Sequence, residues 1–264
     1  MNKKNVSYDI LGNIALIKFP FDMKLSEKKK FSEKFLKKNR SVRTILEKVS
    51  KFQGRLRKQE TKYVLGEKTK EVIYKENGCV FRFNIDSSYF SPRLSNERKE
   101  ISKKIRKNED VLVMFSGVNP YGIVIAKNSL AKKVYSLEIN REANKYAKLN
   151  AQLNNLNDKI ETIQGDVKKF VLKARKRFPK KFDVIVMPRP QLTETFLKEA
   201  FLLSKKNTRI YYYDFCEEDE IPEVKEKIFQ AGKESGRKIK ILETKKAGEI
   251  APYRLRVRVD FKVV

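Results

Sequence analysis

Two neighbouring segments carry the side chains best suited to chemistry. Residues 89–98 (YFSPRLSNER) end in a glutamate followed by an arginine. Residues 111–122 (VLVMFSGVNPYG) are an apolar run followed by glycine, asparagine and proline. A strand that runs into such a turn and then a helix is how doubly wound α/β domains present a nucleotide-like ligand. Together the segments predict a catalytic carboxylate beside a cofactor pocket.

Two further acids follow the next expected strands. Glu138 ends the second strand, where doubly wound folds place the partner of a ribose diol. Asp166 follows the third strand, a position suited to accept from an adenine amino group. Each acid alone is also explained as a helix N-cap or a solvated charge. Both at successive strand ends after a glycine turn predict S-adenosylmethionine binding.

The charge balance is the main compositional signal. Of 264 residues, 61 are Lys or Arg and 33 are Asp or Glu, giving a formal net charge of +28. With a polyanionic partner, this positive charge would speed association and strengthen binding. An enzyme that acts on small molecules does not need such a charge. A lysine-rich proteome is the alternative explanation. The 40% hydrophobic content argues against wholesale disorder.

Several classes of site are excluded by composition. The chain has no histidine, which removes His triads, His general bases and the common zinc sites. Its two cysteines, Cys79 and Cys216, form neither a metal spacing nor a disulfide framework, so no metal site is expected. The first residues lack an apolar signal core, and no apolar run approaches membrane-spanning length. We therefore expect a cytoplasmic protein.

The first 90 residues predict a small basic α+β module. Residues 6–19 alternate around Gly12 and Asn13 and predict a hairpin. Residues 25–46 are lysine-rich with apolar residues at helical spacing, which predicts one or two helices. Residues 55–83 read as hairpin-like strands around residues 66–68 and 76–78.

Residues 91–264 predict a second domain of alternating strands and helices. Expected strands cover residues 111–115, 133–139, 160–164, 182–187, 208–215, 239–244 and 253–263. Expected helices cover residues 121–128, 141–154, 167–177, 193–204 and 221–235. The alternation implies parallel pairing with helices on both faces, and the last two strands suggest an antiparallel closing pair. The pattern is that of the seven-stranded, Rossmann-like α/β sheet of class I methyltransferases.

Three motifs make the resemblance more specific. They are Ser91-Pro92-Arg93-Leu94 with Glu97-Arg98, Met114-Phe115-Ser116-Gly117-Val118, and Tyr212-Tyr213-Asp214-Phe215. They resemble the archaeal and eukaryal tRNA (guanine-37-N1)-methyltransferase family over nearly the whole chain. The match is to the short archaeal form, without the small extra N-terminal domain of many members. The resemblance implies S-adenosylmethionine as methyl donor and the guanosine just 3′ of the anticodon as target.

The resemblance also assigns catalytic roles. Glu97 stands at the position of the general base that removes the N1 proton of guanine. Arg57 is the best match by spacing for the cation that stabilises charge on O6, with Arg55 close behind. Tyr89 is expected to contact the cofactor or the target base. The alternatives are a helix N-terminal acid for Glu97, a phosphate contact for Arg57 and a core side chain for Tyr89.

Other contacts are implied in the same way. Cofactor contacts are expected at Phe115, Gly117 and Met187, and substrate contacts at Arg55, Arg93, Asn96, Pro188, Arg189 and Pro190. Pro188 stands where the family usually has asparagine, which removes a side-chain contact to the base and leaves main-chain carbonyls. Val113 and Asn119 also depart from the family pattern, from an acid and a glycine respectively. These changes fit a broadened specificity, including carbon 7 of a tricyclic wyosine precursor.

Basic clusters are expected to form a tRNA backbone surface that positions RNA without reading it. They are residues 28–30, 37–40, 175–177 and 180–181. Two other functions stay open. One is aminocarboxypropyl transfer in wyosine synthesis, and the other is a non-catalytic RNA-binding protein with a degenerate methyltransferase fold. We expect a monomer whose partner is tRNA around position 37.

Overall fold

The computed structural model describes residues 6–50, 52–173 and 178–264. It divides into two compact units, Met1–Pro92 and Arg93–Val264. The boundary predicted from sequence, between residues 90 and 91, lies two residues earlier. Among the described helices, none combines the length and the apolar character needed to cross a bilayer.

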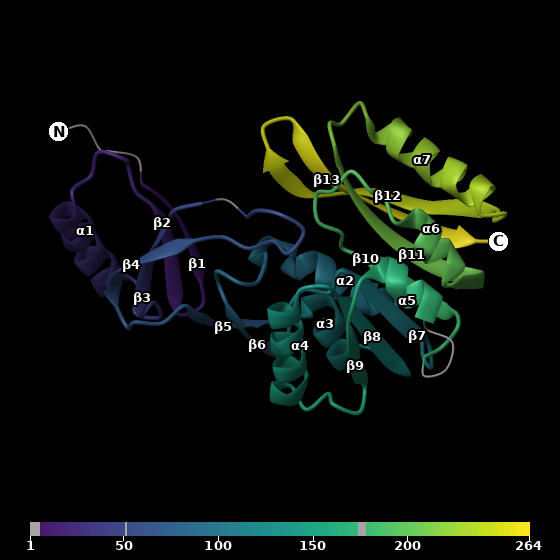
Figure 1. The fold of residues 1–264 in the computed structure, drawn as a ribbon, viewed down its shortest axis with the longest axis horizontal. Helices are drawn as coiled ribbons and strands as arrows, with labels where there is room; N and C mark the ends of the chain where they lie inside the picture. Colours follow the sequence, from purple (N-terminus) through teal and green to yellow (C-terminus); the bar gives the residue numbers. More distant parts are fainter. Residues whose placement is uncertain (1–5, 51, 174–177) are drawn as a thin grey trace. The chain divides into compact units, whose positions relative to one another are not determined.

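The first unit is a four-stranded sheet with one helix, plus a separate hairpin (Figure 1). Its elements are β1 (Ser7–Leu11), β2 (Ile14–Lys18), α1 (Leu25–Lys38), β3 (Thr44–Lys48), β4 (Thr61–Gly66), β5 (Glu71–Glu76) and β6 (Cys79–Asn84). The sheet order is β1-β2-β3-β4, and β5 and β6 form a separate two-stranded sheet. Apolar residues of α1 and the sheet, among them Ile17, Phe35 and Ile45, form its core.

Two sequence predictions for this unit were wrong in part. The expected helix over residues 25–46 ends at Lys38, and Thr44 begins β3. The β-branched Thr44 and Ile45 favour a strand, and both are fully buried in parallel pairing with β2. The strands on either side of residues 66–68 do not form a hairpin, because β4 pairs with β3. The hairpins at Gly12-Asn13 and Asn77-Gly78 are confirmed.

The second unit has the predicted seven-stranded sheet, in the order β12-β13-β11-β10-β7-β8-β9. Its strands are β7 (Asp110–Met114), β8 (Lys133–Glu138), β9 (Ile160–Gln164), β10 (Phe182–Met187), β11 (Ser204–Cys216), β12 (Ile239–Ala251) and β13 (Arg254–Val263). Strands β7 to β11 pair in parallel, and β13 is antiparallel to both β11 and β12. The continuous apolar runs of β7 and β10 match their burial at the centre of a parallel sheet.

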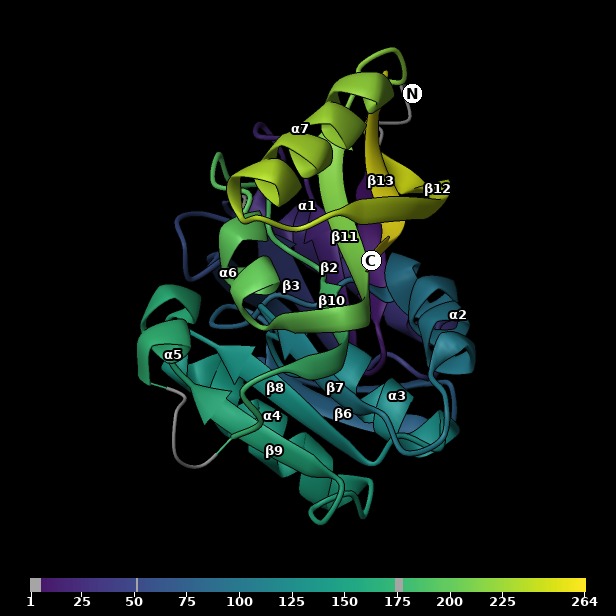
Figure 2. The ribbon, with the colours of Figure 1, turned by 90° about the vertical axis from the view of Figure 1, so that its right-hand side faces the viewer.

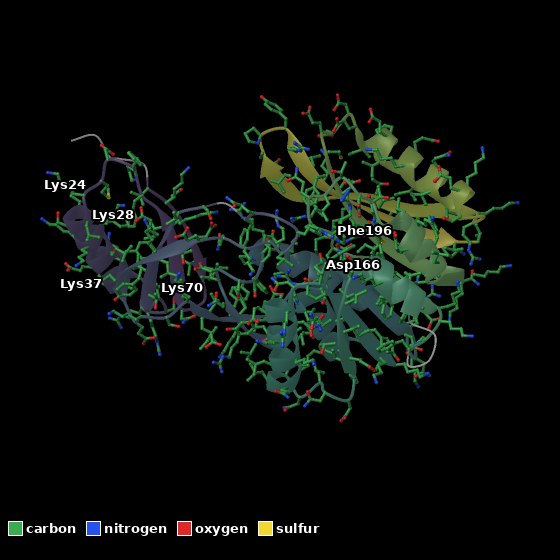
Figure 3. The ribbon with its side chains drawn as sticks, in the orientation of Figure 1. Lys24, Lys28, Lys37, Lys70, Asp166 and Phe196 are labelled. Carbon is green, nitrogen blue, oxygen red and sulfur yellow. The ribbon has the colours of Figure 1, made fainter. Side chains whose placement is uncertain are left out.

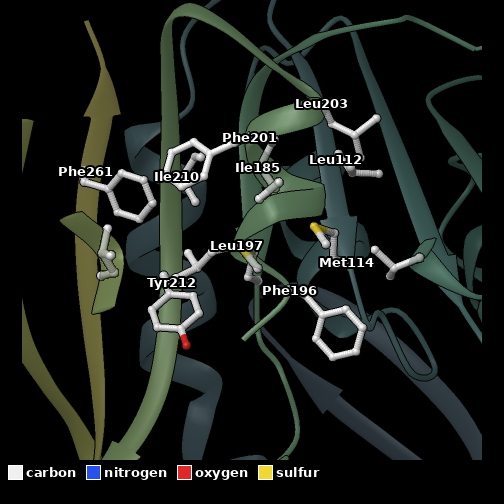
Figure 4. Packing of buried hydrophobic residues seen from close by; sticks show 14 of the residues in the cluster. Leu112, Met114, Ile185, Phe196, Leu197, Phe201, Leu203, Ile210, Tyr212 and Phe261 are labelled. Carbon is white, nitrogen blue, oxygen red and sulfur yellow. The ribbon is translucent and has the colours of Figure 1, made fainter. Parts of the chain in front are cut away.

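Helices cover both faces of this sheet (Figure 2). They are α2 (Ser95–Lys104), α3 (Pro120–Asn128), α4 (Arg141–Leu153), α5 (Val167–Lys173), α6 (Leu197–Leu202) and α7 (Ile221–Glu234). Side chains of α5, α6 and α7 join the sheet in one large apolar cluster (Figure 4). The helix predicted over 193–204 is shorter because Phe196, at φ 58°, is not helical and Ser204 already belongs to β11. Residues 174–177 of another predicted helix lie outside the described residues.

Candidate active site

The loop between β7 and α3 is built from left-handed backbone. Phe115, Gly117 and Asn119 have φ angles of 59°, 58° and 67°. Asparagine tolerates this region better than most residues, so Asn119 can stand where glycine was expected. Its Oδ1 accepts the Ser136 hydroxyl at 2.8 Å, in space left by Gly122. A Cβ on Gly122 would lie 2.1 Å from that oxygen, so the three residues fix the start of α3 together.

Glu138 ties this loop to the next strand end. Its carboxylate accepts the Gly117 amide and the Asn140 amide, each at 2.7 Å. The residue is 8% exposed, and burial raises the pKa of its carboxyl although these amides oppose the shift. Each oxygen retains a lone pair beyond the amide it accepts. The carboxylate can therefore also accept from two hydroxyls of a ribose.

Asp166 lies at the following strand end. Its Oδ1 accepts the Lys168 amide at 2.9 Å, so one oxygen caps α5 as the alternative from sequence proposed. The Lys168 ammonium lies 5.7 Å from the Phe196 ring centroid, and that ring meets Phe115 edge-on at 4.9 Å. Figure 3 labels Asp166 and Phe196 on this part of the unit. An aromatic pair suits the face of an adenine ring, and a carboxylate such as that of Asp166 suits its exocyclic amino group.

The same loop holds a polar atom that lacks a partner. The Ser116 Oγ is buried and makes no hydrogen bond within the described residues. Buried hydroxyls nearly always have a partner, so this hydroxyl is an exception in the loop. With Glu138 and Asp166 at the adjoining strand ends, the residues present fit S-adenosylmethionine.

The loop that follows β10 directs the Arg189 side chain into the interior of the protein. Met187 is fully buried, and its carbonyl accepts the Arg189 amide at 2.7 Å. The Arg189 guanidinium donates to the Asp214 carboxylate at 2.7 Å and to the Leu192 carbonyl at 2.8 Å. Its contacts hold the following loop against β11. Pro188 and Pro190 on either side are half-buried.

A half-open cavity of about 390 Å³ adjoins this loop at the carboxyl ends of β10 and β11. Its lining residues are Gln191, Leu192, Thr193, Asp214, Phe215 and Arg254. The combination of an aromatic ring, amide and hydroxyl groups and a guanidinium suits a planar polar heterocycle.

Glu97 is held in a buried cluster against strands β11 and β13. It is 6% exposed, and its Oε2 accepts the Tyr213 hydroxyl at 3.0 Å and the Arg258 guanidinium at 2.6 Å. Its Oε1 lies 3.4 Å from the Lys245 ammonium. Burial raises the pKa of Tyr213 well above its usual range, so that hydroxyl stays protonated and donates. One oxygen of Glu97 is thus fixed, and the other faces a cation that is 39% exposed.

Arg258 joins Glu97 to other acids without any exposure to solvent. It contacts Glu100 at 2.6 Å and Asp260 at 2.7 Å. Lys104 also pairs with Asp260, at 2.7 Å. Burial would raise the pKa of Glu100, but hydrogen bonds from Lys245 and Arg258 outweigh it and lower that pKa to about 2. The cluster links α2 to the closing strands of the sheet.

In the first unit, a tight turn presents Arg57 against two aromatic rings. Arg57 has φ 51°, and its amide donates to the Gly54 carbonyl at 3.2 Å. Its guanidinium lies 5.5 Å from the Tyr89 ring centroid and 5.7 Å from that of Phe52. The two rings meet edge-on at 4.9 Å. This packing limits the conformations of Arg57, whereas Arg55 in the same turn is exposed.

A family model described as the TRM5/TYW2 methyltransferase domain matches residues 72–242. This chain belongs to the TRM5/TYW2 methyltransferase family. A relative from Nanoarchaeum equitans, named tRNA (guanine(37)-N(1))/4-demethylwyosine(37)-methyltransferase Taw22, is 34% identical over 98% of this chain and 100% of its own length. Trm5b of Pyrococcus abyssi, a tRNA (guanine(37)-N(1))-methyltransferase, is 32% identical over 97% of this chain and 74% of its own. Its crystal structure superposes with a TM-score of 0.83, again over 97% of this chain and 74% of its own.

The family also contains a different transferase. A tRNA(Phe) (4-demethylwyosine(37)-C(7)) aminocarboxypropyltransferase from Methanocaldococcus jannaschii is 29% identical over 97% of this chain and 98% of its own length. Membership in the TRM5/TYW2 family therefore establishes the class I methyltransferase fold. Membership does not by itself show whether a methyl group or an aminocarboxypropyl group is transferred.

The structure places the predicted site residues of this TRM5/TYW2 member in several separate settings. Phe115, Gly117, Glu138 and Asp166 meet at the carboxyl ends of β7, β8 and β9. Met187, Pro188, Arg189 and Pro190 follow β10, and Glu97 lies against β11 and β13. Arg93 and Asn96 are exposed beside Glu97 in sequence, and Arg55, Arg57 and Tyr89 lie in the first unit.

Sequence reasoning missed the groups that hold Glu97. Tyr213, Lys245 and Arg258 lie more than a hundred residues away along the chain and meet Glu97 only through the sheet. A signal was present in β13, where Arg258 and Asp260 alternate with valines in a strand expected to close a buried sheet. Charges at such positions require partners. The partner on α2, however, is visible only in three dimensions.

Proposed function

We propose that this protein transfers a methyl group from S-adenosylmethionine to N1 of guanosine 37 in tRNA. The observation that carries the proposal is the full-length match to the N. equitans enzyme, which spans both units. The fit of the loop at residues 115–119, Glu138 and Asp166 to an adenosine-containing cofactor supports it. The formal charge of +28 suits a polyanionic substrate.

In this mechanism, the second unit holds the cofactor and removes the proton. Glu138 accepts from the ribose hydroxyls and Asp166 from the adenine amino group, with the aromatic pair of Phe115 and Phe196 against the adenine ring. The bound cofactor supplies an electrophilic methyl group on a sulfonium. The cavity beside Phe215 would receive the guanine base whose N1 accepts this methyl group.

Glu97 is the proposed general base for the N1 proton. Its Oε2 already accepts two strong donors, so Oε1 is the oxygen that takes the proton. The Lys245 ammonium faces this oxygen and has to move aside when the base arrives. Because Lys245 is partly exposed, its displacement requires no rearrangement of the buried core. Arg57, held by its aromatic pair, is proposed to stabilise the negative charge that develops on O6.

A second substrate is favoured by one specific observation. The N. equitans relative is named for both guanosine and 4-demethylwyosine at position 37. We infer that this protein also methylates carbon 7 of the tricyclic precursor. The side chain of Pro188 makes no polar contact to a base, so the site does not require the hydrogen-bonding edge of guanine at that position.

The decisive experiment is mass spectrometry of nucleosides from tRNA incubated with the protein and S-adenosylmethionine. Three tRNAs are compared, with guanosine, adenosine or the tricyclic precursor at position 37. Methylated guanosine, with no change at adenosine, is expected, together with one added methyl on the tricycle. An aminocarboxypropyl adduct would identify the other transferase activity, and the absence of any product would favour an RNA-binding role.

Two variants make the assay specific. Glu97→Gln is expected to abolish most of the product, whereas Glu226→Gln, on the exposed face of α7, is expected to leave it unchanged. Both replacements remove one carboxylate charge from a helix. Equal activity of the two variants would argue against Glu97 as the base.

A further inference from the structure

The hairpin formed by β12 and β13 ends in an exposed aromatic residue. β12 ends at Ala251, β13 begins at Arg254, and these two residues pair across a turn made of Pro252 and Tyr253. Tyr253 is 89% exposed and has φ 61°. Left-handed backbone is unfavourable for a tyrosine, and glycine or asparagine would fit this turn with less strain. A large ring at this position is therefore not explained by the fold.

Two arginines beside Tyr253 have no carboxylate partner among the described residues. Arg254 is exposed, and Arg256 is partly buried with its guanidinium 5.1 Å from the Phe215 ring centroid. The lysines on the opposite strand differ, because Lys245 and Lys246 pair with acids. The tip of the hairpin thus combines an exposed ring with cations that remain available to a polyanion.

This tip lies at the edge of the sheet where the proposed chemistry takes place. Arg254 lines the cavity together with Asp214 and Phe215, which belong to the carboxyl end of β11. Phe215 and Arg256 are direct neighbours in the pairing of β11 with β13. Tyr253 directly precedes Arg254, which belongs to the cavity lining.

We propose that Tyr253 stacks on an unpaired nucleotide beside the target base, while Arg254 and Arg256 contact its phosphates. This inference rests on the proposed function, because it takes the RNA at the cavity to be the methyl acceptor. Exposed aromatic residues among cations are the usual platform for single-stranded nucleic acid. Two arginines follow the ring closely in the chain, which favours RNA over an apolar protein surface.

The absence of tryptophan from the chain gives a direct probe. Tyr253→Trp introduces a single indole, whose fluorescence is expected to be quenched by an unmodified anticodon stem-loop with guanosine 37. The matched control is Leu130→Trp, since Leu130 is 66% exposed in the turn before β8, at the amino end of the strands. Its fluorescence is expected to stay unchanged. The proposal would be overturned if bound RNA quenched neither indole, or quenched the indoles of Tyr253→Trp and Leu130→Trp equally.

Affinity measurements separate stacking from other roles of the side chain. Tyr253→Ala is expected to raise the Kd for the stem-loop roughly 5- to 150-fold, as removal of one stacked base does, whereas Tyr253→Phe stays near the wild type. Wild-type affinity of Tyr253→Ala would refute stacking. Quenching without methyl transfer would leave the stacking site intact and reject the proposed function. Methyl transfer without quenching would reject the stacking site and leave the proposed function intact.

Discussion

Replacing Arg258 by methionine is expected to destabilise the protein strongly without creating a cavity. Methionine fills much of the same volume but leaves the carboxylates around it without their shared partner. The cluster holds four acids and three cations: Glu97, Glu100, Glu243 and Asp260 with Arg258, Lys104 and Lys245. After the substitution, four acids face two cations.

The size of the effect follows from which acids lose their partner. Removing one member of a buried ion pair costs about 3–5 kcal/mol, because the remaining charge is buried and uncompensated. Lys104 still pairs with Asp260 and Lys245 still faces Glu97, so we expect about 3 kcal/mol, the lower end. For a unit of this size, that corresponds to a decrease in Tm of roughly 6–12 °C.

The assay is thermal unfolding at pH 7, with Lys246→Met as the control. Lys246 pairs with Glu218 at 2.5 Å, but both side chains are more than half exposed. Breaking that pair is expected to cost about 0–1 kcal/mol. A Tm for Arg258→Met that lies within the range of the control would refute the view that Arg258 compensates buried charge.

Three further predictions concern single carboxylates. Glu97→Gln should lower the methylation rate about 10²-fold or more while cofactor affinity stays constant in equilibrium binding; parallel loss of affinity would contradict its role as base. Glu138→Ala should weaken S-adenosylmethionine binding roughly 10- to 150-fold, and unchanged affinity by calorimetry would exclude the ribose contact. The pKa of Glu100 is lowered on folding, from 4.5 to about 2, so its contribution to stability is present above about pH 4.5 and is lost as pH falls towards 2. Acid unfolding of Glu100→Gln should therefore be less steep in that interval than wild-type unfolding, and superimposable curves would reject the linkage.

Much of the second unit was predictable because its sequence is locally consistent. The bounds of β9 and β10 were predicted to the residue, and the antiparallel closing strands are confirmed. The apolar runs of parallel strands and the N-cap at Asn140, which accepts two helix amides, are local signals. The class of cofactor followed from the same strand ends.

The predictions that failed depend on contacts between distant segments. Residues 44–46 have apolar spacing that also fits a helix, and only pairing with β2 makes them a strand. Nothing local shows that β4 prefers β3 to β5. In the same way, sequence suggested Glu97 as a base but could not supply Arg258, which reaches it from β13. The orientation of Arg189, which turns inward to Asp214, is likewise a tertiary property.

The crowded contact between Asn119 and Gly122 restricts the order in which the two positions can change during evolution. Alanine at 122 would place its Cβ 2.1 Å from the Asn119 oxygen and 2.7 Å from the Ser136 hydroxyl, so it is unfavourable while asparagine is present. Glycine at 119 removes the first clash and fits the left-handed backbone. A lineage with Asn119 and Ser136 must therefore change or reorient both side chains before position 122 becomes free to vary. The reverse order would pass through an intermediate with a damaged cofactor loop.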